Sequence, residues 1–295
     1  MTIKHLLSIN DLNGSEISSI ITRAISSKPM PYNNLLENET VGIWFEKPSL
    51  RTRLSFEIGV KQLGGTTIYL DKDNIGVGSR EPIRDVANVI SRYIYAFIAR
   101  TFAHSTLTEF AKYSTIPIIN ALSDEEHPCQ TLADLVTIQE KFGTLKNITI
   151  AYIGDGNNVA RSLACGAYQI GMPFISSSPE EYKLTIDNEK INQSIIHEIN
   201  PKKAMSAADV IYTDAWTSMG QEAESEIRKK AFQKYQISVE DLNSAKDNAI
   251  LMHPLPAHHG EEISQDLLYH KKSVVFDQAE NRLHAQRAAM EYLFK

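Results

Sequence analysis

Strand-like and helix-like segments alternate along almost the whole chain. Short runs rich in β-branched and aromatic residues occupy residues 41–46, 66–71, 96–101, 116–122, 148–154, 173–178, 209–214, 248–253 and 273–278. Apolar residues at helical spacing occupy residues 54–63, 82–93, 105–113, 131–142 and 280–294. Such alternation predicts right-handed βαβ units and therefore parallel sheets covered by helices.

The chain is long enough for two domains of this kind, because its 295 residues exceed the usual size of a single core. We expect an α/β fold with two parallel-sheet domains, residues 1–135 and 136–295, joined by a helix near residues 131–142. The last helix, residues 280–295, is expected to pack back on the first domain.

Charge and cysteine content narrow the class of protein. A net charge of −6 disfavours loose binding of nucleic acid or of an anionic membrane. Cys129 and Cys165 have neither the spacing of a zinc site nor that of a disulfide framework, which indicates a reducing compartment. The start of the chain lacks a targeting pattern, and no apolar stretch reaches 18 residues. We therefore expect a cytoplasmic protein.

Polar residues that follow strands in the first half are the first candidates for chemistry. Residues 48–53, Pro-Ser-Leu-Arg-Thr-Arg, lie between a strand and a helix, where free N–H groups, hydroxyls and guanidiniums suit a phosphate. Arg100 ends the third strand, and His127 and Gln130 follow the fourth. Each alone is as readily a helix cap or a surface residue. Because parallel strands end at one edge of a sheet, we expect these side chains to converge.

The predicted cluster favours a compact phosphorylated carbonyl compound as its ligand. It combines two or three cations with a hydroxyl, an imidazole and an amide. No pair of acidic residues accompanies these groups to hold magnesium, which disfavours phosphoryl transfer from a nucleotide.

The second half offers a different set of polar groups at strand ends. Residues 154–158, Gly-Asp-Gly-Asn-Asn, suggest a dinucleotide site, but Val159 stands at the third glycine position and the next strand ends in Ser176-Ser177-Ser178 rather than in an acid. Asp214 and Ser218, with Asn158, suit the two ends of an amino acid. Taken alone, the segment that begins at Asp214 is more readily a simple turn.

A proline-rich loop leaves the strand at residues 248–253. Its sequence, His253-Pro254-Leu255-Pro256, predicts a stiff backbone with fixed carbonyl groups. The adjacent His258 and His259 rarely share one ion, so we expect a solvated turn there and no metal.

Together these segments resemble the transcarbamylase family. Residues 49–53 resemble its Ser-x-Arg-Thr-Arg phosphate loop, and residues 127–130 its His-Pro-x-Gln motif. Residues 154–158, and Asp214 with Ser218-Met219-Gly220, are similar to the branch that uses ornithine. The resemblance extends from near the N-terminus to Arg282.

The resemblance implies transfer of the carbamoyl group of carbamoyl phosphate to the side-chain amine of L-ornithine, without a metal or organic cofactor. It further implies a homotrimer with shared active sites. The implied ligands of carbamoyl phosphate are Ser49, Leu50, Arg51, Thr52, Arg100, His127, Gln130, Leu255 and Arg282, of which Thr52, Arg100 and His127 act in catalysis. The implied ligands of ornithine are Asn158, Asp214, Ser218 and Met219.

Three positions depart from the family pattern. Leu50 replaces a common threonine, and Gly76 lies near a position where relatives often have glutamine. Pro254 replaces the cysteine usual in the ornithine branch and matches the aspartate branch, whereas Ala257 does not match the aspartate branch. The alternatives are therefore transfer to aspartate, putrescine or an N-acylated ornithine, or a non-catalytic binding protein.

Overall fold

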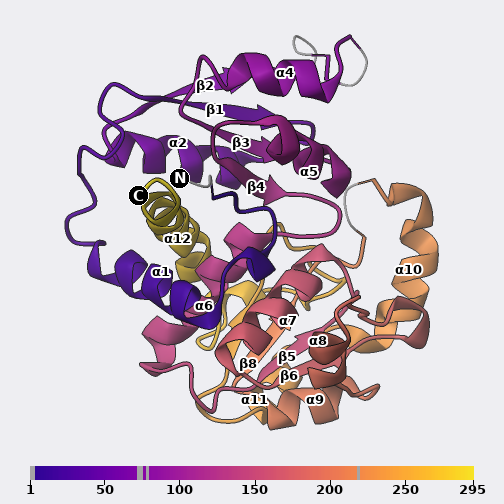
Figure 1. Ribbon diagram of the computed structural model, residues 1–295. Helices are drawn as coiled ribbons and strands as arrows, with labels where there is room; N and C mark the ends of the chain where they lie inside the picture. Colours follow the sequence, from indigo (N-terminus) through magenta and orange to yellow (C-terminus); the bar gives the residue numbers. More distant parts are fainter. Residues whose placement is uncertain (1–3, 72–75, 78–79, 218–219) are drawn as a thin grey trace. The chain divides into compact units, whose positions relative to one another are not determined.

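The computed structural model describes residues 4–71, 76–77, 80–217 and 220–295 (Figure 1). The chain forms two compact units, one of Met1–Val136 with Glu280–Lys295 and one of Thr137–Ala279. Each unit contains one parallel sheet. The predicted α/β fold with two parallel-sheet domains is therefore confirmed.

The sheet of the first unit has the order β2-β1-β3-β4. Its strands are β1 (Thr40–Phe45), β2 (Thr66–Leu70), β3 (Ala96–Arg100) and β4 (Ile118–Leu122). The chain moves from β1 to one neighbour and later returns to the other side of β1. The carboxyl ends of β1 and β3 therefore form a topological switch point, where ligands of such sheets bind.

Helices cover both faces of this sheet, because right-handed crossovers on opposite sides of β1 fall on opposite faces. The crossover helices are α2 (Leu50–Gln62), α4 (Ile83–Ile90) and α5 (His104–Tyr113), and α1 (Gly14–Ser26) precedes β1. Val86 of α4 and Phe110 of α5 pack with Trp44 and Phe97 of the sheet in one apolar core. On α2, a Cβ added to Gly59 would lie 3.1 Å from Met290 Cε, so this glycine brings α2 close to the last helix.

The second unit has the strand order β7-β6-β5-β8-β9, again all parallel. Its strands are β5 (Ile150–Ile153), β6 (Phe174–Ser177), β7 (Ile195–His197), β8 (Val210–Thr213) and β9 (Ile250–Met252). Its helices are α7 (Asn158–Ile170), α8 (Glu189–Ser194), α9 (Pro201–Ala207), α10 (Ser225–Phe232) and α11 (Val239–Ser244). The switch point here lies between β5 and β8.

Two helices contribute residues to both units. They are α6 (Pro128–Phe142) and α12 (Val275–Leu293). Short 3-10 turns complete the described chain at Ile9–Asp11, Glu180–Tyr182, Glu222–Glu224, Gln233–Tyr235 and Leu267–Tyr269. No helix in the described ranges is both long and apolar enough to cross a membrane.

The predicted strand at residues 273–278 is wrong. Ser273 forms one isolated bridge with Leu251, and α12 begins two residues later at Val275. Within this segment Val275 and Gln278 are buried and Phe276 is exposed, a helical spacing that the β-branched composition concealed. The Gln278 side chain accepts from the backbone N–H of His253 and donates to Tyr212, contacts that a local pattern does not encode.

Candidate active site

The predicted phosphate loop lies where β1 leads into α2. Ser49 is the N-cap of α2, and its hydroxyl accepts the backbone N–H of Thr52 at 3.4 Å. Leu50 and Arg51 are the first two residues of the helix, so their N–H groups have no acceptor within it. A phosphate oxygen can accept from such groups and is favoured by the helix dipole. The capping role of Ser49 and anion binding are therefore compatible.

Three arginines lie in or beside this loop. Arg100, the last residue of β3, and Arg282 of α12 are buried, and Arg51 is half-buried. Burial, together with repulsion from Arg282 and Arg51, lowers the pKa of Arg100 to about 10. Neither Arg51 nor Arg100 has an ion-pair partner in the described part of the chain. Positive charge held in this way favours a dianion.

His127 lies in the same cluster, just before α6. It is buried, and desolvation with repulsion from Arg282 and Arg100 lowers its pKa well below the ordinary value. His127 is therefore a neutral imidazole at neutral pH, with one N–H to donate. A neutral donor can stabilise developing negative charge on a carbonyl oxygen without adding another positive charge to the cluster.

A chain of buried hydrogen bonds joins three of the predicted residues. Arg282 donates through Nη1 to Gln130 Oε1 at 2.7 Å and through Nη2 to Thr52 Oγ1 at 3.1 Å. Gln130 in turn donates through Nε2 to Asp134 Oδ1 at 2.8 Å. The structure thus brings α2, α6 and α12 together around one polar cluster.

Lys47 is a further cation of this cluster that the sequence analysis missed. It is buried between the end of β1 and the phosphate loop, with Nζ 4.3 Å from the centroid of the Phe102 ring. Burial and repulsion from Arg100 lower its pKa. Its place directly after a strand and before the Ser49 loop was the signal that could have identified it.

In the second unit, backbone conformation or close packing disfavours any side chain at the two glycines of residues 154–158. Gly154 has φ +144°, and a Cβ on Gly156 would lie 2.6 Å from the backbone of Leu184. Asn157 caps α7 by accepting from Val159 and Ala160 N–H groups, and it donates through Nδ2 to Asp214 Oδ2 at 2.9 Å. The motif predicts Asn158, the half-buried first residue of α7, as a ligand, whereas the residue that contacts Asp214 is its neighbour Asn157.

Asp214 follows β8 and lies at the switch point opposite the turn after β5. Burial raises its pKa, and the electrostatic effect of nearby His253, with hydrogen bonds from Asn157 and from its own neighbour Ala215, only partly offsets that increase. No Lys or Arg pairs with Asp214 in the portion of the chain that is described. Ser218 and Met219, predicted to accompany it, lie outside the described residues.

A buried arginine joins the two turns of this half-site. Arg228 of α10 donates to Asp155 Oδ2 at 2.8 Å and to the carbonyl of Trp216 at 3.1 Å. It also pairs with Glu224 at 3.0 Å. The turn after β5 and the loop after β8 are thereby held by one side chain.

The loop after β9 is fixed by a buried His–Glu pair. His253 Nδ1 accepts the N–H of Leu255 at 2.9 Å, and His253 Nε2 lies 3.1 Å from Glu262 Oε1. Leu255 has φ +58°, an unfavourable conformation for a branched residue that requires such support. The direction of the Leu255 carbonyl is therefore set by its surroundings.

Residues 4–140 match the carbamoyl-phosphate-binding domain of the aspartate/ornithine carbamoyltransferase family. Residues 146–293 match its aspartate/ornithine-binding domain. The chain belongs to this family. Arg51 and Arg100 fall within the first matched segment, and Asp214 and Arg282 fall within the second.

Similar carbamoyltransferases come from several organisms. An ornithine carbamoyltransferase of Archaeoglobus fulgidus is 48% identical, covering 98% of this chain and 96% of that protein. The structure of ornithine carbamoyltransferase from Pyrococcus furiosus has a TM-score of 0.92 and 42% identity, covering 98% of this chain and 97% of that one. The anabolic enzyme of Campylobacter jejuni has a TM-score of 0.93 and 35% identity, with 99% of both chains covered.

One group of possible metal ligands occurs in the described ranges of this carbamoyltransferase. Atoms of His258, Glu261 and Glu262 lie within 4.8 Å of one another. However, Glu262 Oε1 accepts from the backbone N–H of His258 and lies against His253, and Glu261 pairs with Lys229 at 3.1 Å. These contacts engage Glu262 Oε1 and Glu261, whereas Glu262 Oε2 has no hydrogen bond within the described residues and lies 3.7 Å from His258 Nδ1.

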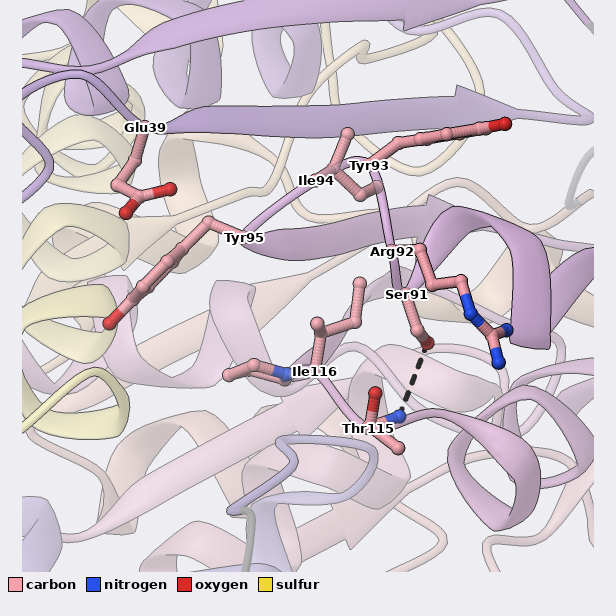
Figure 2. Close-up of a pocket in the computed structure, with 9 residues that line it drawn as sticks. Glu39, Ser91, Arg92, Tyr93, Ile94, Tyr95, Thr115 and Ile116 are labelled. Atoms are coloured by element: carbon pink, nitrogen blue, oxygen red, sulfur yellow. Dashed lines mark hydrogen bonds between the residues drawn. The ribbon is translucent and has the colours of Figure 1, made fainter.

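A cavity of about 380 Å³ in this carbamoyltransferase lies away from the candidate site (Figure 2). Its lining includes Glu39, Tyr95 and Pro117, which immediately precede β1, β3 and β4. Figure 2 shows Ser91 accepting the backbone N–H of Thr115 at 3.2 Å on its wall. The cavity is thus at the amino edge of the sheet, opposite to the edge where parallel sheets bind their ligands.

Proposed function

We propose that this transferase moves the carbamoyl group of carbamoyl phosphate to the side-chain amine of L-ornithine, giving L-citrulline and phosphate. The observation that carries the choice of acceptor is Asp214, a half-buried carboxylate with no Lys or Arg side chain paired to it in the described part of the chain. Ornithine brings an ammonium group that neutralises this charge. Aspartate would bring two more carboxylates, and an unpaired buried charge costs several kcal/mol.

The first unit supplies the groups that the carbamoyl donor requires. The N–H of Leu50 and the side chains of Ser49, Arg51, Thr52 and Arg100 hold the phosphate. Gln130, His127 and Arg282 of this unit are proposed to hold the carbamoyl group, and the carbonyl of Leu255, which belongs to the second unit, is proposed as a further ligand. Charge that develops on the carbonyl oxygen is met by Thr52, Arg100 and neutral His127, and a well-placed donor of this kind contributes about 3 kcal/mol.

The second unit is proposed to hold the acceptor. Asp214, Asn158 and Ser218 with Met219 bind the amino-acid end, which leaves the neutral side-chain amine to attack the carbonyl carbon. A C–N bond forms, the C–O bond to phosphate breaks, and the phosphate leaves. Since Pro254 offers no acidic or basic atom, the departing phosphate accepts the proton of the amine.

We extend the proposal to a homotrimer in the cytoplasm that serves arginine biosynthesis. Support for an interface comes from α2, whose Leu50, Leu54 and Ile58 expose apolar side chains at a spacing of four residues. Ile68 of the neighbouring edge strand β2 is exposed as well. Contiguous exposed apolar side chains commonly mark a protein interface. Light scattering of the purified protein tests the trimer.

A competition among acceptors tests the proposed reaction. Carbamoyl phosphate is supplied with ornithine, aspartate, putrescine or N-acetylornithine, the ureido product is identified by mass spectrometry, and kcat/KM is compared. We expect ornithine to be preferred, and Asp214→Asn to lose at least about a hundredfold in kcat/KM for ornithine, since about 3 kcal/mol of ion pairing is removed. Faster turnover of another acceptor, or no product with any of the four, contradicts the proposal.

A further inference from the structure

The proposed reaction gives no task to Asp134, a fully buried residue of α6. A carboxylate inside a protein core is costly unless its contacts compensate for the loss of water. Asp134 lies one helical turn after Gln130 and accepts its Nε2 at 2.8 Å. Its position on the side of Gln130 away from Arg282 suggests that it acts on the amide of Gln130.

The amide of Gln130 is held between groups of opposite hydrogen-bonding character. Arg282, which donates to Gln130 Oε1 at 2.7 Å, can only donate, whereas a carboxylate such as Asp134 can only accept. A reversed amide would place its NH₂ against the guanidinium and its oxygen against the carboxylate. Both contacts would become repulsive, so the orientation of the amide is fixed from two sides.

This fixed orientation of the amide gives the cluster a defined pattern of hydrogen-bond donors and acceptors. The oxygen of Gln130 uses one lone pair for Arg282 and retains a second one, since a carbonyl oxygen accepts twice. Thr52 Oγ1 accepts from Arg282, which leaves its hydroxyl proton available to a ligand. The chain of contacts therefore offers an acceptor at Gln130 and a donor at Thr52. A carbamoyl group has the matching pattern, with N–H donors on nitrogen and an acceptor on its carbonyl oxygen.

We propose that Asp134 is a positioning residue that keeps the oxygen of Gln130 available to the carbamoyl nitrogen, and so selects carbamoyl phosphate against acyl phosphates such as acetyl phosphate. An acetyl group has the same shape and carbonyl but offers a methyl group where the carbamoyl group offers N–H. Asp134 acts through Gln130 and does not touch the substrate. The inference rests on the proposed function, because Gln130 must face the carbamoyl group.

The test compares two unreactive ligands that differ only at this point. Phosphonoacetamide carries the amide NH₂, acetonylphosphonate carries methyl in its place, and inorganic phosphate reports the anion site alone. Dissociation constants are measured by calorimetry with the full chain. We expect the unaltered protein to prefer phosphonoacetamide by about tenfold or more, the value of one well-placed hydrogen bond in a desolvated site.

Three substitutions of Asp134 and one control substitution separate a positioning role from a loss of stability. Asp134→Leu removes the acceptor for Gln130, so the preference should fall to about twofold or less while phosphate affinity stays within about twofold. Asp134→Asn retains an oxygen that can accept and should keep the preference within about threefold of the original. Asp134→Ala is measured alongside, in case leucine prevents folding. Asp209→Leu is the matched control, since it removes a buried carboxylate that bonds to Thr149 and Lys246 in the second unit.

Each outcome bears on one hypothesis. A folded Asp134→Leu or Asp134→Ala protein that keeps the full preference overturns the role of Asp134 but leaves the proposed reaction intact. Equal weakening of all three ligands also overturns it, because it indicates general damage to the site. If the unaltered protein binds phosphonoacetamide no better than phosphate, the proposed function itself fails.

Discussion

The charged side chain of Arg100 should destabilise the unliganded protein and strengthen the binding of an anion. Lowering its pKa to about 10 from the ordinary arginine value corresponds to about 3 kcal/mol of unfavourable interaction for the charged side chain. The causes are burial first, then repulsion from Arg282 and Arg51. Replacing Arg100 with methionine, which has a similar length and no charge, removes that cost.

The expected results of Arg100→Met therefore have opposite signs. The free energy of unfolding without ligand should stay unchanged or rise by at most about 3 kcal/mol. Any packing that methionine does not restore makes the increase smaller. Affinity for phosphonoacetamide and kcat/KM should both fall by about a hundredfold or more, because a charge-assisted contact to the phosphate is lost.

Urea unfolding with and without saturating phosphonoacetamide, together with steady-state kinetics, measures both quantities on one protein. Arg84→Met, on the exposed face of α4 and over the Tyr113 ring, is the control; it should leave ligand affinity and kcat/KM unchanged and lower stability by about 1 kcal/mol or less. Loss of more than about 2 kcal/mol of stability with near-normal ligand affinity would refute the reasoning, since it would make Arg100 a structural residue.

Two further predictions concern the second unit and pH. Arg228→Lys cannot bridge Asp155 and the Trp216 carbonyl as a guanidinium does, so KM for ornithine should rise by about tenfold while calorimetry shows unchanged phosphonoacetamide binding. His127 has a folded pKa below its unfolded value of about 6.5, so the unfolded chain takes up the proton first and stability falls as pH drops below about 6.5. His127→Asn should reduce that loss, measured as the difference in unfolding free energy between pH 7 and pH 5; an unaltered difference would show that His127 does not titrate on unfolding.

The features that could be predicted from the sequence are the local ones. A strand end followed by a helix start is encoded within a few residues, which is why the placement of Ser49 before α2 and of Asp214 after β8 agrees with the pattern. Because parallel strands end at a common edge of the sheet, polar residues after different strands could be predicted to lie together in one site. The roles of the site residues themselves remain predictions.

The missed features depend on contacts between distant parts of the chain. The bond between Gln130 and Arg282 spans 152 residues, and no spacing rule reveals that Asp134 completes the same chain of contacts. The sequence motif at residues 154–158 does not distinguish Asn157 from Asn158. Only the geometry of the turn decides which of the two caps α7 and hydrogen-bonds to Asp214. The strand assigned to residues 273–278 failed for the same reason, because tertiary contacts of Gln278 override β propensity.

The division of the first unit into two sequence segments has a consequence for its synthesis on the ribosome. Residues 137–279, the whole second unit, are made after β4 and before Arg282. During that interval α2 lacks the helix that packs at Gly59, and Thr52 and Gln130 lack their shared donor. The second unit, being continuous, can fold first as it emerges, whereas the first must wait for contacts of high sequence separation. A chain truncated after residue 279 and released from the ribosome should therefore have a protease-resistant second unit, while the phosphate cluster remains unassembled.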